Sequence, residues 1–266
     1  MRQGSSPSSA REALIQPLKL VTYNLHKGMS PLNRRVRLHE MLLALQHLDA
    51  DLLFLQEVQG HHMRRAARFS DYPPEAHHHF LAHRLRRRAA YGLNASHRYG
   101  HHGNAILSRF PIRLCCNLDL SVNRFEQRGV LRCDIQLPGW PMVVTALCVH
   151  LNLLALDRKR QMAVLERYID EHVPHEHSLI LAGDFNDWRG EAHELFAERM
   201  NLLDAHHTVH GELARSFPAR LPLLPLDRIY VRGLIISEAR VLHGLPWRRL
   251  SDHLPISATL LPRGAK

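Results

Sequence analysis

The stretch Ser178-Leu179-Ile180-Leu181-Ala182-Gly183-Asp184-Phe185-Asn186 decides the fold class of this 266-residue chain. Its short apolar run is typical of a strand that is covered on both faces. A glycine, a carboxylate and an amide follow where that strand should end. Asp184 and Asn186 are two positions apart, so in extended backbone both side chains project to the same side. The stretch therefore predicts a buried strand that delivers polar groups to the edge of a sheet.

The same arrangement recurs along the chain. Polar residues at the ends of apolar, strand-like runs are Asn24, Glu57, Asn104, His150, Asp184, Asn186, Asp227 and the Asp252-His253 pair. Asp227 shares one face of its strand with Ile229 and Val231, so its carboxylate needs a partner in the interior. An imidazole such as that of His253 can supply this partner.

The order of the elements indicates a mixed α/β fold. Helical patterns alternate with strands in the first and last parts of the chain, and strands follow one another over residues 103–149. We expect a helix capped by Asn33 that runs to Leu48, and a second helix over residues 154–172. Residues 60–99 indicate one or two short helices and long loops. Two sheets packed face to face, with helices outside and a groove at one rim, would suit this pattern.

Composition limits the class of protein. The chain is 45% hydrophobic and has a formal net charge of +10, which favours polyanionic partners such as nucleic acid, anionic lipid or phosphorylated sugars. We expect residues 1–16 to form a flexible tail and residues 17–263 a single domain. No apolar run has the length of a membrane span, and the cysteines lack a CxxC spacing. We therefore expect a cytoplasmic monomer, with peripheral contact to anionic surfaces as an option.

Taken in order, these segments resemble the endonuclease/exonuclease/phosphatase superfamily, the DNase I-like fold. The matching stretches are Thr22-Tyr23-Asn24, Leu55-Gln56-Glu57, Gly103-Asn104-Ala105-Ile106-Leu107-Ser108, Val149-His150-Leu151, Gly183-Asp184-Phe185-Asn186, Leu226-Asp227-Arg228-Ile229 and Ser251-Asp252-His253-Leu254-Pro255-Ile256. The chain looks most similar to small bacterial members whose substrate is not established. The resemblance implies a four-layer αββα sandwich of two mixed β-sheets, and it implies hydrolysis of phosphate esters with a divalent metal, Mg²⁺ or Mn²⁺.

The resemblance also implies roles at the metal and at the reacting phosphate. Glu57 would be the principal metal ligand, with Asn24 and Asp252 in support. Asp184 would orient or deprotonate the attacking water, and Asn186 would hold the scissile phosphate.

The resemblance gives three further residues a role. Asp227 and His253 would form an Asp–His pair. His150 would stabilise the pentacovalent phosphorus or assist the leaving oxygen. Asn104 would be a secondary substrate contact.

Substrate contacts beyond these residues are expected from two tryptophans and an arginine. Trp188 follows Asp187, and Trp247 is followed by two arginines, so both rings could lie near the mouth of the groove. A tryptophan beside arginines can stack a base or sit at a lipid interface. Arg128 is a candidate phosphate contact.

Three questions stay open: the substrate class, catalysis as against binding alone, and metal binding by the paired histidines. The substrate could be nucleic acid or a phospholipid or inositol-phosphate ester, and a steep salt dependence of DNA binding would favour the former. A non-catalytic polyanion-binding module with the same fold is the alternative to an enzyme. The paired histidines, such as His77-His78-His79 and His101-His102, would suit a zinc or nickel binder, although we expect most of them at the surface.

Overall fold

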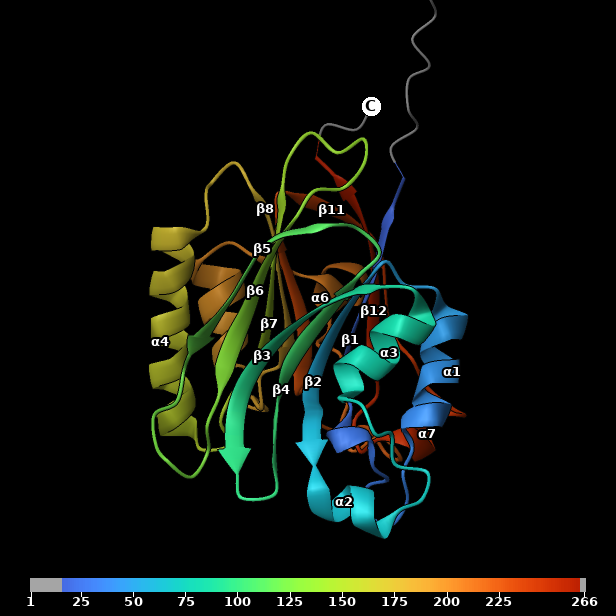
Figure 1. The fold of residues 1–266 in the computed structure, drawn as a ribbon. Helices are drawn as coiled ribbons and strands as arrows, with labels where there is room; N and C mark the ends of the chain where they lie inside the picture. Colours follow the sequence, from blue (N-terminus) through green and yellow to red (C-terminus); the bar gives the residue numbers. More distant parts are fainter. Residues whose placement is uncertain (1–15, 264–266) are drawn as a thin grey trace, which may run out of the picture.

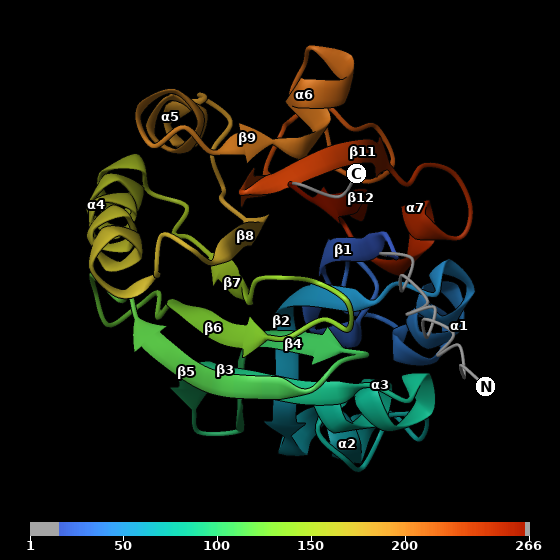
Figure 2. The same ribbon diagram turned by 90° about the horizontal axis from the view of Figure 1, so that it is seen from above.

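The computed structural model describes residues 16–263 and contains two six-stranded sheets packed face to face, with helices on the outer sides (Figures 1 and 2). Sheet 1 has the order β11-β12-β1-β2-β4-β3 and sheet 2 the order β5-β6-β7-β8-β10-β9. The strands of sheet 1 are β1 (Leu18–Asn24), β2 (Leu52–His62), β3 (Arg88–His97), β4 (Gly100–Ser108), β11 (Leu234–Val241) and β12 (Ile256–Pro262). Those of sheet 2 are β5 (Ile112–Asp119), β6 (Gly129–Ile135), β7 (Val144–His150), β8 (Ser178–Asp184), β9 (Leu203–Asp204) and β10 (Asp227–Arg232).

Helices form the two outer layers. Sheet 1 is covered by α1 (Leu38–Leu48), α3 (His77–Leu85) and α7 (Trp247–Leu250), while α2 (Met63–Arg68) lies at the lower end of the molecule in Figure 1. Sheet 2 is covered by α4 (Ala155–His172) and by α5 (Glu191–His193), which continues into the π-helical segment η2 (Glu194–Arg199). The helix α6 (Ala205–His210) packs on β11 and β10, and a short 3₁₀ turn, η1 (His26–Gly28), follows β1. This four-layer αββα sandwich confirms the predicted fold class.

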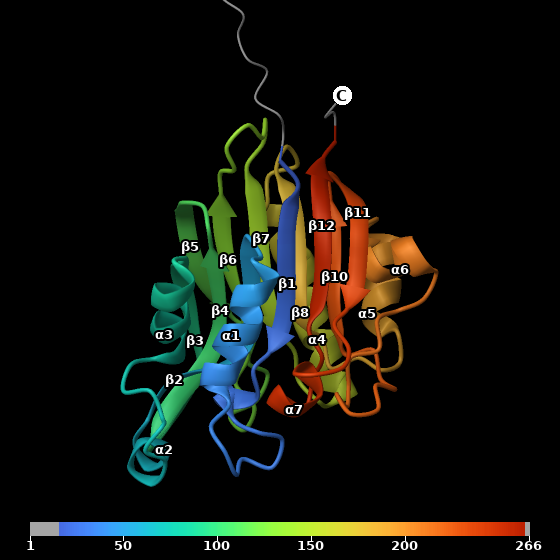
Figure 3. The ribbon, with the colours of Figure 1, turned by 90° about the vertical axis from the view of Figure 1, so that its right-hand side faces the viewer.

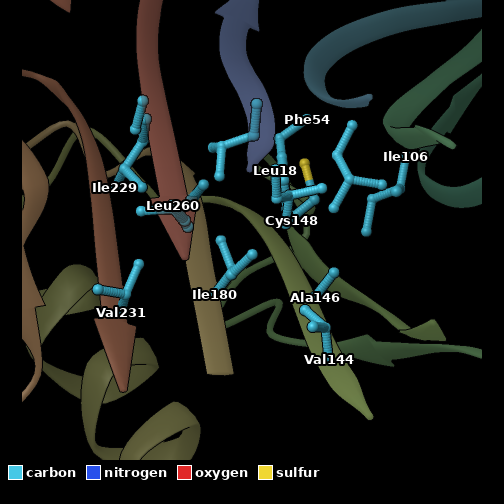
Figure 4. Packing of buried hydrophobic residues seen from close by; sticks show 14 of the residues in the cluster. Leu18, Phe54, Ile106, Val144, Ala146, Cys148, Ile180, Ile229, Val231 and Leu260 are labelled. Carbon is cyan, nitrogen blue, oxygen red and sulfur yellow. The ribbon is translucent and has the colours of Figure 1, made fainter. Parts of the chain in front are cut away.

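The space between the sheets is filled by apolar side chains from both (Figure 4). Phe54 and Ile106 come from sheet 1, and Cys148, Ile180 and Ile229 come from sheet 2. All five have an exposed fraction of 2% or less. Burial of aliphatic side chains on this scale is the main term that holds the sheets together.

Two sequence expectations about elements are wrong. Asn33 does not cap α1, because the helix begins at Leu38, five residues after Asn33, which adopts a φ of 53°. Residues 88–97 form the edge strand β3 and not a loop, since all of them except Asn94, which lies at a register shift, pair with residues of β4. His77 and His78 are buried in α3, whereas the other paired histidines, such as His61, His79 and His207, are exposed or partly exposed, as expected for most of them.

The predicted tail, residues 1–16, lies outside the described residues except for Gln16, whose carbonyl oxygen accepts a hydrogen bond from the Trp140 indole at 3.2 Å. Among the helices of residues 16–263, none has both the length and the apolar character of a membrane span.

Candidate active site

Strand register brings the predicted polar residues to one end of the sandwich. The parallel pairing of β7 with β8 sets His150 opposite Asp184, and the antiparallel pairing of β8 with β10 sets Asp184 opposite Asp227. In sheet 1, β1 ends at Asn24, which lies opposite Gln56 on the parallel strand β2, next to Glu57. We call this the site end of the molecule, and the opposite end the far end. The site end points downward in Figures 1 and 3.

Asp227 and His253 form the predicted pair. His253 Nδ1 lies 2.7 Å from Asp227 Oδ2, and the Ser216 hydroxyl donates a second hydrogen bond to the same oxygen at 2.5 Å. Burial alone would lower the pKa of His253, but the carboxylates of Asp227 and Asp184 outweigh it and raise that pKa to about 10. The imidazole is therefore a buried cation that is held in place from one side.

Asp184 stands at the centre of the cluster. Its Oδ2 accepts a hydrogen bond from Asn24 Nδ2 at 2.9 Å and lies 3.5 Å from His150 Nε2 and 3.7 Å from His253 Nε2. Burial raises the pKa of Asp184 to about 7, with the Asp227 charge acting in the same direction. A carboxyl group with this pKa exchanges a proton close to neutral pH.

Gly183 lets β8 approach β7 closely at this point. Its φ is 151°, and a Cβ at this position would lie 2.0 Å from the carbonyl oxygen of Val149. Only glycine has space here, so the residue before Asp184 is fixed by the sheet rather than by chemistry.

Asn186 follows in a left-handed conformation with a φ of 49°. Its backbone N–H donates to Asp184 Oδ1 at 3.0 Å and its side-chain Nδ2 donates to the Leu151 carbonyl oxygen at 2.8 Å. These two bonds orient the Asp184 carboxylate and tie the loop after β8 to the loop after β7. A direct contact between Asn186 and a phosphate stays a prediction.

His150 is neutral in this environment. Burial and the neighbouring Arg128 guanidinium hold the pKa of His150 well below its usual range. Arg128 Nη1 lies 3.4 Å from His150 Nδ1, and its Nη2 donates to Glu126 at 2.6 Å. Arg128 therefore places a fixed positive charge beside the cluster, as a phosphate contact requires.

Glu57 lies at the partly exposed mouth of the site, within a β-bulge of β2. The bulge lies between Leu55 and Val58, and Glu57 has a φ of 52°, an uncommon conformation for a residue with a side chain. Lys27 Nζ is 3.1 Å from Glu57 Oε2. Burial would raise the pKa of Glu57, but the Lys27 charge outweighs it and the pKa falls to about 2.

Asp252 is the second carboxylate at the mouth. Its Oδ1 lies 3.1 Å from His26 Nδ1 and accepts a hydrogen bond from the Ser251 hydroxyl at 3.2 Å. Burial is again outweighed, here by the His26 hydrogen bond and the His253 charge, so the pKa of Asp252 is about 2. Asn24 adjoins this group, since its Oδ1 accepts the backbone N–H of His26.

Two sets of side chains could hold a metal. In the first set, among the described residues, Asp184, Asp227 and His253 each offer one possible ligand atom, and these atoms lie within 4.8 Å of one another. Their atoms are already engaged with each other, with Ser216 and with Asn24. The oxygens of Glu57 and Asp252 instead face the cationic or imidazole groups of Lys27 and His26 at the mouth, and both carboxyl groups are ionised. Ionised carboxylates beside an amide oxygen fit a hard divalent cation.

Two predicted substrate contacts are corrected by the structure. Asn104 has no exposed surface, and its Nδ2 bridges the two sheets by donating to the carbonyl oxygens of Gly129 and Cys148. Trp247 is 7% exposed and packs edge-on against Tyr23 in the layer between sheet 1 and its helices. Both side chains are therefore buried within the fold, and neither lies at the mouth of the site.

Trp188 is placed differently, because its ring is 43% exposed beside the loop that holds Asn186. The guanidinium of Arg158 stacks 4.9 Å from the centre of this ring. Its role in substrate binding stays a prediction.

Sequence reasoning missed two residues that shape the site. Lys27 carries the charge opposite Glu57, and Ser216 donates to Asp227 from a loop far from any motif. The segment His26-Lys27-Gly28 directly after the β1 strand end was a usable signal for Lys27. Nothing in the local sequence marks Ser216. No third site built from the paired histidines accompanies these groups among the described residues, which disfavours the zinc or nickel reading.

Comparisons with known proteins agree with this geometry. The chain is 41% identical to the uncharacterized protein YbhP of Escherichia coli (strain K12) over 242 residues, which cover 91% of this chain and 95% of the relative. An endonuclease/exonuclease/phosphatase structure from Bacteroides vulgatus has a TM-score of 0.73 at 16% identity and covers 93% of this chain and 100% of that chain. A humanized D. rerio TDP2 has a TM-score of 0.72 at 18% identity, with 92% and 98% covered.

The sequence model of the Endonuclease/Exonuclease/phosphatase family matches residues 21–253. That range contains all the residues of the cluster, from Asn24 to His253. The chain therefore belongs to the endonuclease/exonuclease/phosphatase family.

Proposed function

We propose that this protein hydrolyses phosphate esters with the help of Mg²⁺ or Mn²⁺. The observation that carries the proposal is a carboxyl group, Asp184, whose pKa is near neutrality and which lies between the His253–Asp227 pair and His150. Such a group can take a proton from water, while the adjacent imidazolium neutralises charge on a phosphate oxygen.

In this proposal each residue of the site has its own role in the reaction. Asp184 orients the attacking water and accepts its proton as the water oxygen bonds to phosphorus. The P–O bond to the leaving group breaks, and the leaving oxygen departs as an alcohol with a proton from solvent. His253, Arg128 and Asn186 bind non-bridging oxygens, and the neutral His150 donates a hydrogen bond through its N–H.

Glu57, Asp252 and Asn24 would hold the metal at the mouth. The metal would supply positive charge that neutralises the phosphate and polarises it. Lys27 lies 3.1 Å from Glu57, so the carboxylate is ionised without a divalent cation.

The test is hydrolysis of a substrate panel with Mg²⁺, Mn²⁺ or EDTA. The panel contains bis-p-nitrophenyl phosphate, plasmid DNA, an abasic duplex, a single-stranded oligonucleotide, phosphatidylglycerol, cardiolipin and an inositol phosphate. We expect cleavage that needs the metal and is lost in His253→Ala. If no member is cleaved with any metal, the alternative of a non-catalytic polyanion-binding module gains support.

A second arm addresses the metal site directly. Glu57→Gln keeps the size of the side chain but removes its charge, so we expect the Mg²⁺ concentration for half-maximal activity to rise about tenfold to 100-fold. Glu238→Gln, on the exposed strand β11, is the matched control and should keep the parent metal requirement. An unchanged requirement in Glu57→Gln would place the metal elsewhere.

We also propose that residues 17–263 act as one domain, as a monomer in the cytoplasm. In support, the site joins residues of both sheets, from Asn24 to His253, and the four cysteines are free thiols.

A further inference from the structure

Large apolar side chains are exposed in the loops at the site end. Six connections each carry at least one, among them Leu32, Phe125, Leu154, Trp188, Leu221 and Leu245. We call these six the rim residues. Phe125 is 86% exposed, and Leu32 and Leu245 are 70% and 69% exposed. Exposed apolar groups that gather on one face mark an interaction surface.

The far end lacks this feature. In the connections of that end within residues 16–263, no large apolar side chain is exposed. Leu137 and Trp140 in the loop between β6 and β7 are both buried. The exposed apolar groups of the loops thus belong to one end of the molecule, the lower end in Figures 1 and 3.

Each of five rim residues has an exposed arginine close by in the sequence. These arginines are Arg34 and Arg35 after Leu32, Arg124 before Phe125, Arg189 after Trp188, Arg220 before Leu221, and Arg249 after Leu245. None of them forms an ion pair with another described residue. At the far end, Arg87 and Arg109 are paired with Asp49, while the exposed Arg86 between α3 and β3 forms no ion pair with another described residue.

The rim surrounds the site. The Phe125 loop contacts the loop after β7 through a hydrogen bond from the Leu153 N–H to Glu126 Oε1 at 3.3 Å, and it carries Arg128, which contacts His150. On the opposite side, the Leu221 loop contacts the site through a hydrogen bond from the Ala219 N–H to the Asp252 carbonyl oxygen at 2.7 Å. A partner that covers the rim would therefore bring its own groups to the mouth.

The geometry points to the surface of an anionic phospholipid bilayer as this partner. Apolar side chains that enter the headgroup region, flanked by arginines that pair with lipid phosphates, are the composition of interfacial membrane-binding surfaces. A nucleic acid would account for the arginines and for stacking on Phe125 or Trp188. It would not account for the four leucines, which have no aromatic face and would stay in contact with water.

This inference rests in part on the proposed function, because it names the substrate class of the same site. A headgroup phosphodiester at the mouth would be hydrolysed with one water, which bonds to phosphorus as the P–O ester bond breaks. The docking itself does not depend on turnover, so the two can be tested separately.

The experiment measures sedimentation of the full chain with vesicles in EDTA, where no metal-dependent hydrolysis occurs. We expect binding to vesicles of phosphatidylcholine with phosphatidylglycerol, little binding to phosphatidylcholine alone, and a decrease at high salt. The triple variant Phe125→Ser/Leu221→Ser/Leu245→Ser should bind at least about tenfold more weakly. The matched control is Leu43→Ser/Leu114→Ser/Ile235→Ser, which replaces exposed apolar residues on α1, β5 and β11 and should bind as the parent does.

Fluorescence gives an independent readout. Trp188 is the exposed member of the three tryptophans, since Trp140 and Trp247 are 5% and 7% exposed. Anionic vesicles should shift the emission of the parent to shorter wavelength, and Trp188→Phe should abolish the shift.

Three outcomes would overturn the inference. The first is equal binding to neutral and anionic vesicles, or to neither. The second is an equal loss of vesicle binding in the rim triple variant and in the control variant. The third is tight binding of a single-stranded oligonucleotide that the rim triple variant loses, without binding of anionic vesicles by the parent, which would assign the surface to nucleic acid.

Soluble substrate separates this result from the proposed function. Hydrolysis of bis-p-nitrophenyl phosphate by the rim triple variant should match that of the parent, which also shows that the variant folds. If the parent binds anionic vesicles but hydrolyses no phosphate ester, the docking surface stands and the proposed reaction fails.

Discussion

The two ends of the sandwich are built from the same strands but follow different rules. At the far end, charged side chains find partners: Asp51 forms an ion pair with Arg109 Nε at 2.7 Å and accepts a hydrogen bond from the Lys19 N–H at 2.9 Å. At the site end, Asp184 is buried with its pKa raised to about 7, and exposed arginines such as Arg124 and Arg220 form no ion pair with another described residue. The far end serves the fold, whereas the site end keeps charges that only a ligand would complete.

Backbone conformation shows the same contrast. Asp49 and Arg86 have a positive φ because each ends a helix, α1 and α3, in the ordinary left-handed cap. Lys27, Glu57 and Asn186 also have a positive φ, but none of them ends an α-helix, and all three lie in the site. At the site end, these uncommon backbone conformations therefore position side chains of the site and do not serve to end helices.

The largest expected effect is the loss of hydrolysis when a carboxylate is replaced at the site end but not at the far end. Asp184→Asn should lower the hydrolysis rate by about a thousandfold or more, because the amide cannot accept the proton of water. Its free energy of unfolding should change by only about 1 kcal/mol, since relief of a buried carboxylate offsets one lost acceptor.

Asp51→Asn is the matched change at the far end. We expect unchanged hydrolysis and a loss of about 1 kcal/mol in the free energy of unfolding. Steady-state kinetics and urea unfolding of both variants provide the measurement. Similar rates for the two variants would end the assignment of Asp184 as the proton acceptor.

Two glycines with positive φ, one at each end, allow the cost of a backbone change to be compared between the two ends. Gly183→Ala should cost about 3 kcal/mol or more, because its Cβ would overlap the Val149 carbonyl oxygen and force β7 and β8 apart. Gly139→Ala, in the far-end turn before Trp140, has open space around its Cβ and should cost only about 1–2 kcal/mol of conformational strain. Thermal or urea unfolding would measure both, and equal costs would show that β7 and β8 can relax without penalty.

A smaller effect concerns acid stability near the site end. Burial lowers the pKa of His77 to about 3, and neither ring nitrogen has a hydrogen-bond partner among the described residues. The unfolded chain therefore binds the proton first as pH falls below about 6.5, and stability is lost in that direction. From about pH 7 to about pH 5 the loss from this one group should be about 2 kcal/mol.

His77→Leu should remove that part of the pH dependence and leave stability at about pH 7 nearly unchanged, because no hydrogen bond is lost. His47→Leu on the exposed side of α1 is the control and should keep the parent slope. Urea unfolding at the two pH values provides the comparison. If His77→Leu keeps the parent's dependence of the free energy of unfolding on pH, groups other than His77 set the acid sensitivity.

Local sequence was sufficient for the framework because each strand carries its own signal. The apolar runs before Glu57, His150 and Asp184 predict buried strands, and the polar residue that ends each run predicts a place at a sheet edge. The edge strand β3 was missed because Arg88-Ala89-Ala90-Tyr91 has no alternation, and its stability comes from pairing with β4.

The sequence by itself determined the αββα architecture and the residues available for chemistry, since apolar patterning and strand ends are local properties. Only the tertiary structure decided which candidates meet. It placed Asn104 between the sheets and Trp247 behind sheet 1, and it brought Ser216 to Asp227 across a loop. It also decided the charge states of Asp184 and His253, because burial and the distance between charges arise only when distant strand ends converge.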